Sequence, residues 1–507
     1  MNITEKDLKS IIEQVMVNIT KDESHTDNNV KVEVMKEINL ATQNIVNPMS
    51  SSVISNLGVF ENIKDAIEAA DLAQKEFSKN FTLQDREKII SKIRSMVLEN
   101  KLELAKMIHE ETKLGRYEDK IAKLELAAIK TPGTECLKTE AFSGENGLTI
   151  VEEGPFGVIG AVTPVTNPVE TVICNSIGFI ASGNSAVYNV HPSSKRCAAH
   201  IVKLINEVII ENGGPKNLIT MVKEPTMDTM KELTTNPKVR MLLGTGGPGL
   251  VRALLQSGKK AIGAGAGNPP VVVDETANIE NAAKQIIKGA SFDNNILCIA
   301  EKEVFVVNEV ADDLIFNMLN NGAYMLSSEE LEKVMSFALE VNVDKVARGC
   351  SLNPNREYHV AKEWVGKNAD SFLDKIGVKH NGEIKLLICE VDFDHPYVQL
   401  EQMMPVLPIV RVRNVDEAIE LAVKAEHGNR HTAMMHSTNI DNLTKFAKAI
   451  ETTIFVKNAS SLSGVGADGE GYTTMSIAGP TGEGLTCARN FTRKRRCVLA
   501  EGGFRIV

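Results

Sequence analysis

Apolar and polar residues follow one another along most of the chain in the pattern of an α/β protein. Short apolar runs, each expected to be a buried strand, alternate with longer segments that carry apolar residues at helical spacing. The runs lie at 157–162, 185–190, 217–222, 239–244, 270–274 and 301–307. Because helices that alternate with buried strands usually connect parallel neighbours, the pattern predicts a parallel sheet. The stretch GAGAGNPP at 263–270 interrupts it and is the predicted domain boundary.

The segment before these runs has a different pattern. Residues 4–19 carry one apolar helical face, and no apolar residue follows between Thr20 and Asn29, so we expect a tethered helix. Its mixed charges favour a protein partner over a membrane surface or a presequence, although docking on its own domain or on a neighbouring subunit is the alternative. Residues 59–126 are predicted to be helical without strands, and 147–164 to form strands with a turn at Glu153-Gly154-Pro155.

Composition narrows the possible functions. The chain has 507 residues, 43% of them apolar, and a net charge of −10, which argues against a nucleic-acid surface. The basic run from Arg493 to Arg496 is therefore interpreted as an oligomer contact or a phosphate-facing patch. No apolar run approaches the roughly 18 residues that a membrane span needs. The eight cysteines show neither CxxC nor zinc spacing, so we expect no metal, and Cys174 and Cys389 are expected in the core.

Three glycine- or proline-containing stretches are candidate ligand sites, and the first two follow predicted strands. The first, TPVTNP, contains Thr163, Pro164, Thr166 and Asn167; ligands bind at such positions in open α/β sheets, although Asn167 could simply cap a helix. The second, GTGGPG at 244–249, fits a phosphate-binding turn or a plain tight turn. In the third, GAGAGNPP, glycines stand at alternate positions. They could let a ligand approach the backbone, or they could make this stretch a flexible crossover between domains.

One cysteine stands out by position. Cys298 follows the polar run FDNN, which suggests a loop, and precedes an apolar run. A thiol on a loop is a candidate nucleophile, whereas a thiol in an apolar core is inert, so both a catalytic and a structural Cys298 remain open.

Taken in order, TPVTNP, GTGGPG, GAGAGNPP and FDNNILC resemble the aldehyde dehydrogenase superfamily, and more closely its coenzyme A-acylating branch. The resemblance extends over roughly residues 55–500, through LEQMMPVLPIV and TGEGLTCARNFTRKRRC, and is greatest to the propionaldehyde dehydrogenases of bacterial microcompartments. It implies a Rossmann-like nucleotide domain, a catalytic α/β domain and a small oligomerisation element. The implied nucleotide domain is 41–262, with an oligomerisation hairpin near 140–155, and the implied catalytic domain is 263–450. Residues 451–507 would return to the nucleotide domain and add a C-terminal oligomerisation segment.

The resemblance also implies roles for particular residues. Cys298 would attack the aldehyde carbonyl, pass a hydride to NAD and hold the acyl group as a thioester. Its own N–H and either Asn167 or Thr166 would stabilise the oxyanion, with Asn167 favoured because an amide is a fixed donor. Glu401 would bind the nicotinamide ribose. Other implied cofactor contacts are Thr163, Pro164, His191, Gly244, Thr245, Gly246, Gly249, Gly263 and Gly265.

Two departures from the family pattern bear on the reaction. Hydrolytic members carry a glutamate where this chain has Gly263 or Ala264. They also carry a ribose-binding lysine at a position near which this chain has Asn189 and no lysine. The missing lysine leaves NADP possible beside NAD. Water needs a base to become a nucleophile, whereas a thiol with a pKa near 8.5 is partly ionised unaided, so the missing glutamate favours transfer to coenzyme A.

The predicted function is therefore oxidation of a short aliphatic aldehyde such as propionaldehyde to acyl-CoA. The alternatives are a hydrolytic dehydrogenase using Glu301 or Glu303 as base, a general NAD-binding oxidoreductase with a structural Cys298, and a non-catalytic cargo or scaffold protein. We expect a homo-oligomer, a dimer or tetramer, in the bacterial cytoplasm inside a microcompartment. Residues 1–20 would bind a shell protein, residues 21–40 would be a linker, and no nucleic acid or membrane would be involved.

Overall fold

The computed structural model of the chain describes residues 57–341 and 358–501. The predicted helix at 1–20, the linker at 21–40 and Cys350 lie outside these ranges.

Six parallel strands form the first sheet in the order β1-β6-β5-β4-β7-β8. They are β1 (Val59–Phe60), β4 (Val158–Val162), β5 (Ser185–Asn189), β6 (Ile219–Val222), β7 (Val239–Thr245) and β8 (Lys260–Ala264). The strand patterns predicted β4 to β7. They missed β1, which is too short to show a period and contradicts the prediction of no strands in 59–126, and β8, which carries lysine and glycine among its five residues.

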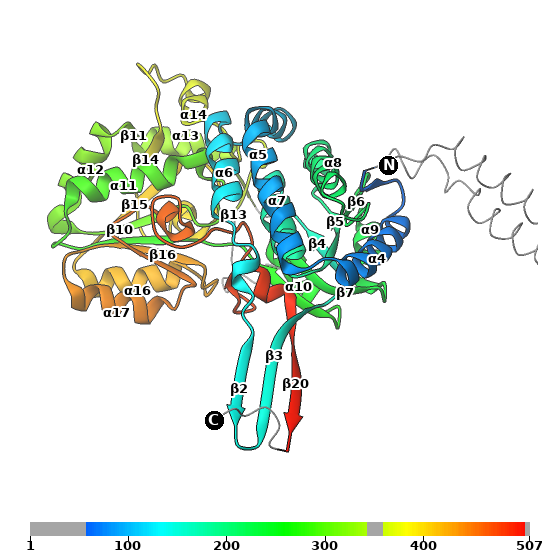
Figure 1. Cartoon of the computed structure of the whole chain (residues 1–507). Helices are drawn as coiled ribbons and strands as arrows, with labels where there is room; N and C mark the ends of the chain where they lie inside the picture. Colours follow the sequence, from blue (N-terminus) through cyan, green and yellow to red (C-terminus); the bar gives the residue numbers. More distant parts are fainter. Residues whose placement is uncertain (1–56, 342–357, 502–507) are drawn as a thin grey trace, which may run out of the picture. The chain divides into compact units, whose positions relative to one another are not determined.

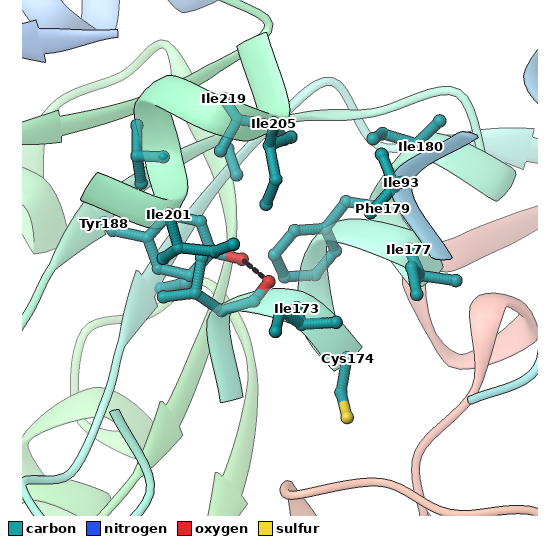
Figure 2. Close-up of a cluster of buried hydrophobic side chains, with 14 of the residues drawn as sticks. Ile93, Ile173, Cys174, Ile177, Phe179, Ile180, Tyr188, Ile201, Ile205 and Ile219 are labelled. Atoms are coloured by element: carbon teal, nitrogen blue, oxygen red, sulfur yellow. Dashed lines mark hydrogen bonds between the residues drawn. The ribbon is translucent and has the colours of Figure 1, made fainter. Parts of the chain in front are cut away.

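Helices cover both faces of this sheet. They are α4 (Ile63–Asn80), α5 (Leu83–Thr112), α6 (Tyr117–Lys130), α7 (Pro168–Ala181), α8 (Lys195–Glu211), α9 (Met227–Thr235) and α10 (Pro248–Leu255). One core joins α5, α7 and α8 to the sheet, and a second joins α4, α9 and α10 to its other face. Figure 2 shows part of the first core, where Phe179 of α7 lies between Tyr188 of β5 on one side and Ile93 of α5 on the other. Cys174 is buried there, as expected.

Seven parallel strands form the second sheet in the order β11-β14-β15-β10-β9-β16-β17. They are β9 (Pro270–Val273), β10 (Glu303–Val307), β11 (Ala323–Met325), β14 (Leu386–Glu390), β15 (Val406–Val412), β16 (Thr432–His436) and β17 (Ile454–Lys457). The chain passes from the first sheet to the second between Ala264 and Pro270. Cys389, on β14, is fully buried as expected.

Helices also cover both faces of the second sheet, with α11 and α12 in one core and α16 and α17 in the other. The helices of this part are α11 (Ile279–Ser291), α12 (Asn308–Asn320), α13 (Ser328–Ala338), α14 (Ala369–Ile376), α15 (Pro396–Gln399), α16 (Val415–Ala425) and α17 (Ile440–Ile450). Two small antiparallel pairs are β12 (Leu339–Val341) with β13 (Tyr358–Val360) and β18 (Ile477–Ala478) with β19 (Gly484–Leu485). Short 3-10 helices are η1 (Thr134–Cys136), η2 (Pro192–Ser194), η3 (Phe292–Asn295), η4 (Ser461–Val465) and η5 (Ala488–Phe491).

A third sheet, here called the three-stranded arm, consists of β2 (Glu140–Gly144), β3 (Gly147–Pro155) and β20 (Thr492–Ala500). In Figure 1, β20 lies beside β3 although the two are far apart in the sequence, and their antiparallel register runs from Thr492↔Pro155 to Ala500↔Gly147. The predicted turn at Glu153-Gly154-Pro155 is wrong, because these residues belong to β3. The break before β4 falls at Phe156-Gly157, where Gly157 has φ +125°.

Candidate active site

The residues predicted to bind a cofactor lie around one edge of the first sheet. Thr163 follows β4, His191 follows β5, Gly246 follows β7 and Gly265 follows β8, so these four lie beyond the carboxyl ends of parallel strands. The hydroxyl of Thr163 is buried and makes no hydrogen bond to a described residue. A buried hydroxyl without a partner is unusual in a folded protein, which suits a ligand at this edge.

The glycines of GTGGPG and GAGAG divide into two groups. A Cβ at Gly244 would overlap Leu254, and one at Gly263 would lie 2.5 Å from Val251 Cγ1, so both glycines allow α10 to pack on the sheet. Gly249 has open space around its Cα. The structure therefore gives Gly244 and Gly263 a packing role, and leaves open space at Gly247 and Gly249, at the start of α10, where a ligand could approach the backbone.

A cavity of about 750 Å³ lies along α10, from its N-terminal residue Pro248 to Gln256 beyond its C-terminal end. Its wall includes Pro248, Arg252, Gly265, Arg430 and Pro480. A helix N-terminus carries partial positive charge and unpaired N–H groups, and arginine side chains pair with phosphate oxygens. The cavity therefore has the charge for a phosphate-containing ligand. The hydroxyl of Thr245, in contrast, is hydrogen-bonded inside the protein to the hydroxyl of Ser476, at 2.8 Å.

The polar run before Cys298 is not the exposed loop that its composition suggests. Asp293, Asn294 and Asn295 are buried, with left-handed φ values of 49°, 54° and 66°. Such a conformation is costly for residues other than glycine and persists only where surrounding contacts enforce it. Asn295 Nδ2 donates to the carbonyls of Ala290 and Glu301, at 2.8 and 2.9 Å. The segment that leads to the thiol is therefore held by buried hydrogen bonds.

Two buried lysines of α6 connect this segment to the loop after β4. The carboxylate of Asp293 lies 2.7 Å from Lys120 Nζ and 2.6 Å from Lys123 Nζ. Lys123 also lies 3.2 Å from Glu170 and donates to Asn167 Oδ1 at 2.7 Å. Burial alone would lower the pKa of Lys123, but the charges of Asp293 and Glu170 raise it, so the ammonium remains charged.

This contact fixes the orientation of the Asn167 amide. Because Oδ1 accepts the Lys123 proton, the NH₂ end is the end that remains to donate elsewhere. Its hydrogen bond to Thr166 Oγ1 is long, at 3.3 Å. Asn167 and Cys298 line the same pocket, whereas Thr166 is not among the residues of its wall. The geometry therefore supports Asn167 over Thr166 as the second oxyanion donor.

The pocket shared by Cys298 and Asn167 has a volume of about 390 Å³ and a mostly apolar wall, which includes Leu126, Phe292, Ile299, Leu462 and Ile477. Its carboxylates belong to partly exposed side chains that are paired with lysines: Glu125 with Lys101, and Asp468 with Lys288 at 2.6 Å. Such a wall suits a small aliphatic substrate.

The surroundings of Cys298 keep its thiol protonated. Burial, followed by the negative charge of Glu401, raises its pKa to about 12, against the opposing charge of Lys302. Glu401 Oε1 accepts a hydrogen bond from Gly267 N at 3.5 Å, which places this carboxylate near the thiol as well as beside the glycine-rich stretch. Lys302 Nζ donates to the carbonyls of Asn295 and Leu297, at 2.7 and 3.2 Å, and so supports the chain just before Cys298.

The structure adds His431, which no motif in the sequence marked. A Cβ at Gly267 would lie 2.7 Å from the Cys298 carbonyl oxygen and 3.1 Å from His431 Cγ, so the cysteine backbone and the imidazole both border this glycine. Nδ1 of His431 pairs with Thr432 Oγ1 at 2.8 Å, while Nε2 has no partner among the described residues. Burial and then Lys302 lower the pKa of His431 to about 4, so the ring is neutral.

The two glutamates considered as alternative bases, Glu301 and Glu303, are not among the residues that line the Cys298 pocket. Glu301 is buried and accepts hydrogen bonds from Ser461 N and Oγ, at 2.9 and 2.8 Å, while burial raises its pKa to about 7. Burial also raises the pKa of Glu303, on β10, well above its usual value. The geometry does not favour either as the base of a hydrolytic reaction.

Within residues 57–341 and 358–501, His, Cys, Asp and Glu form no group suited to holding a metal ion. The helices of these same ranges are all too short or too polar to cross a bilayer.

The side chain of His191, predicted as a cofactor contact, is exposed beyond the end of β5. Its Nδ1 accepts the N–H of Ser193 at 3.2 Å, so His191 caps the short helix η2.

The first parallel sheet ends in turns open to a ligand, and a half-buried thiol before β10 of the second sheet shares a pocket with an amide donor. This arrangement is that of a thiol-dependent α/β enzyme with a nucleotide-type cavity. The chain belongs to the aldehyde dehydrogenase family, which residues 35–483 match. The resemblance inferred from the sequence motifs and the α/β fold class are thereby confirmed.

Similar proteins place the chain more narrowly within that family. It is 44% identical to an acetaldehyde dehydrogenase (acetylating) of Bilophila wadsworthia, over the full length of both chains. A Rhodopseudomonas palustris propionaldehyde dehydrogenase, solved with bound coenzyme A and an acylated cysteine, is 49% identical with a TM-score of 0.82, covering 87% of this chain and 98% of that one. A propionaldehyde dehydrogenase from the Clostridium phytofermentans fucose utilisation microcompartment is 47% identical, with a TM-score of 0.83 and coverage of 89% and 100%.

Proposed function

We propose that this protein oxidises a short aliphatic aldehyde and transfers the acyl group to coenzyme A, using NAD or NADP as the hydride acceptor. The observation that carries the proposal is that Cys298 shares an apolar pocket with the oriented amide of Asn167. The relatives that act on acetaldehyde and propionaldehyde support a two- or three-carbon substrate.

Each residue has a defined task in this reaction. The thiolate of Cys298, a minor species that forms when the thiol proton passes to water, attacks the carbonyl carbon, and the resulting oxyanion accepts hydrogen bonds from Cys298 N–H and Asn167 Nδ2. NAD or NADP, held beyond the carboxyl ends of the first sheet's strands, would supply the hydride acceptor, and loss of hydride from the former carbonyl carbon would leave an acyl thioester on Cys298. We assign Thr163, Gly246, Gly265 and Glu401 to that nucleotide; the unpartnered hydroxyl of Thr163 and the cavity along α10, whose wall includes Gly265, support the assignment.

The acyl group then leaves by thiol exchange. The incoming thiol of coenzyme A must lose its proton, and we assign the neutral imidazole of His431 as the acceptor because its Nε2 makes no hydrogen bond within residues 57–341 and 358–501. The position that carries the hydrolytic glutamate in other members lies at the end of β8, where this chain has Gly263 and Ala264. The absence of that side chain supports acyl transfer over hydrolysis.

The test is to incubate the pure protein with propionaldehyde and NAD, with and without coenzyme A, and to follow NADH and the acyl product. With coenzyme A, NADH should accumulate steadily alongside propionyl-CoA. Without it, NADH should stop near one equivalent per chain, because the thioester persists. Sustained NADH formation with free propionate as the product would instead show a hydrolytic dehydrogenase. Repeating the assay with acetaldehyde and with NADP would give the preferred substrate and nucleotide.

The three-stranded arm supports a homo-oligomer, a dimer or tetramer. Its strands carry exposed apolar residues, with Phe142 58%, Val498 59% and Leu499 44% exposed. Exposed apolar side chains on strands with unpaired edges commonly mark an interface. Of the basic residues on β20, Lys494 and Arg495 lie opposite Glu153 and Glu152 of β3 in the strand register, and Lys494 Nζ lies 3.3 Å from Glu140 of β2.

For the N-terminus we propose that residues 1–20 bind a microcompartment shell protein, and that the enzyme works inside that compartment in the bacterial cytoplasm. The support is the amphipathic pattern of the segment and the microcompartment origin of one structural relative. Deleting residues 1–20 should leave turnover intact while abolishing co-sedimentation with shells. Loss of folding on deletion would favour a helix docked on the enzyme instead.

A further inference from the structure

Two half-buried thiols, Cys136 and Cys487, lie together outside the pocket of Cys298. Cys136 ends η1, just before β2, and Cys487 directly precedes η5, which leads into β20. The Cys136 thiol donates to the Cys487 sulfur. The Arg489 side chain also joins η5 to η1, because its Nη2 and Nε donate to the Cys136 backbone carbonyl at 3.1 and 3.3 Å. Neither thiol has a role in the proposed reaction.

The surroundings favour a thiolate on Cys487 rather than on Cys136. The Cys487 sulfur accepts a hydrogen bond from Cys136 and from the backbone N–H groups of Arg489 and Asn490, and the guanidinium of Arg489 is close by. The hydrogen bond from Cys136 makes the largest contribution and lowers the pKa of Cys487 to about 6. The same pairing raises the pKa of Cys136. Of the two, Cys487 is therefore the nucleophile at neutral pH.

We propose that Cys136 and Cys487 form a thiol–disulfide exchange site that closes an internal disulfide when it meets a low-molecular-weight disulfide. The Cys487 thiolate attacks one sulfur of the reagent, breaks its S–S bond and releases one thiolate. The Cys136 sulfur then gives up its proton, attacks Cys487 and expels the second thiol. The protein loses two thiol hydrogens as a disulfide forms, and the reagent is reduced to two thiols.

The bond would join two segments that hold the arm and one wall of the aldehyde pocket. Thr486, next to Cys487, pairs its hydroxyl with that of Thr474 at 3.0 Å, and Thr474 lines the pocket. On the other side, η1 follows α6, whose Lys130 lines the same pocket and accepts the N–H of Thr473 at 3.0 Å. The exchange site therefore lies directly behind the substrate wall and between the starts of β2 and β20.

The test treats the reduced full-length protein, in wild-type and Cys298→Ser forms, with hydroxyethyl disulfide at pH 7. We expect the loss of two titratable thiols per chain, a peptide cross-link between residues 136 and 487 by mass spectrometry without reduction, and full reversal by dithiothreitol. Because the bond would close a very long loop, the melting temperature should rise by several degrees without reductant.

Single variants separate the steps. Cys136→Ser should trap one mixed disulfide on Cys487, whereas Cys487→Ser should leave Cys136 unreacted. Cys497→Ser, at an exposed cysteine of β20, is the matched control and should leave the cross-link unchanged. If a variant fails to fold, alkylation of the wild type at pH 6.5 still decides, since Cys487 should react faster than the more exposed Cys497. Absence of a 136–487 cross-link, or equal loss of thiols at all exposed cysteines, would overturn the proposal.

Discussion

At the scale of single residues, the site depends on how neighbouring groups orient or charge the reacting atoms. Lys123 holds one end of the Asn167 amide, so the other end becomes a fixed donor. Glu401 and burial hold the Cys298 thiol in its neutral form. Both effects come from contacts between residues that are far apart in the sequence, and each can be tested by changing one functional group.

The role of Asn167 is best tested by a nearly isosteric change. Asn167→Asp keeps an oxygen for Lys123 but removes the NH₂ donor, so we expect kcat to fall by about 10²–10³ with little change in thermal stability. Thr166→Ala is the matched control, and its kcat should stay within a few-fold of the wild type. Steady-state kinetics with saturating coenzyme A would measure both, and the reverse ranking would assign the oxyanion contact to Thr166.

The charge of Glu401 should have two opposite effects. Since the carboxylate raises the pKa of Cys298, Glu401→Gln should speed alkylation of Cys298 by iodoacetamide at pH 7.5 several-fold, while raising KM for NAD through loss of the ribose contact. In the wild type, alkylation should accelerate about tenfold per pH unit from 7 to 9, because the thiolate is a minor species throughout that range. Glu420→Gln, at an exposed ion pair with Lys424, serves as the control. Slower alkylation of Glu401→Gln would contradict the electrostatic account.

At the scale of elements, substitutions in the three-stranded arm test the proposed assembly most directly. Its exposed apolar residues are expected to be buried between subunits, so Val498→Asp should shift the protein toward smaller assemblies in light scattering. Leu72→Asp, at a 63% exposed position on α4, should leave the assembly unchanged. Equal assembly of both variants would show that the arm does not form the interface.

The sequence predicted most elements of both sheets because their strands are continuous apolar runs and their helices are strongly amphipathic. It could not predict β1, whose two residues carry no period, or the left-handed run from Asp293 to Asn295. That run is stabilised by lysines of α6 and by backbone carbonyls, which are visible only in three dimensions. His431 was missed for the same reason, since a lone histidine between polar residues gives no local signal. The order of the motifs along the chain was sufficient to predict Cys298, Asn167 and the loops that follow the strands of the first sheet.

At the scale of the whole molecule, buried neutral histidines should limit stability in acid. Burial lowers the pKa of both His431 and His436 to about 4, below the usual value of about 6.5 in the unfolded chain. Their contribution is therefore fully present above pH 6.5 and is lost as the pH falls toward 4, at up to about 3 kcal/mol per imidazole. The melting temperature should fall steeply between pH 6.5 and 4.5. His436→Gln should flatten that fall, and an unchanged slope would show that carboxylates dominate acid unfolding.

The register between β3 and β20 also has a consequence for how the protein is made. On the ribosome, β3 emerges well before its partner strand, because most strands of both large sheets lie between the two in the sequence. Until β20 has been synthesised, the growing polypeptide must carry an incomplete ribbon with one bare edge, which is the kind of edge that recruits foreign strands. Completion of this ribbon, and any assembly that depends on it, therefore has to wait for the synthesis of β20.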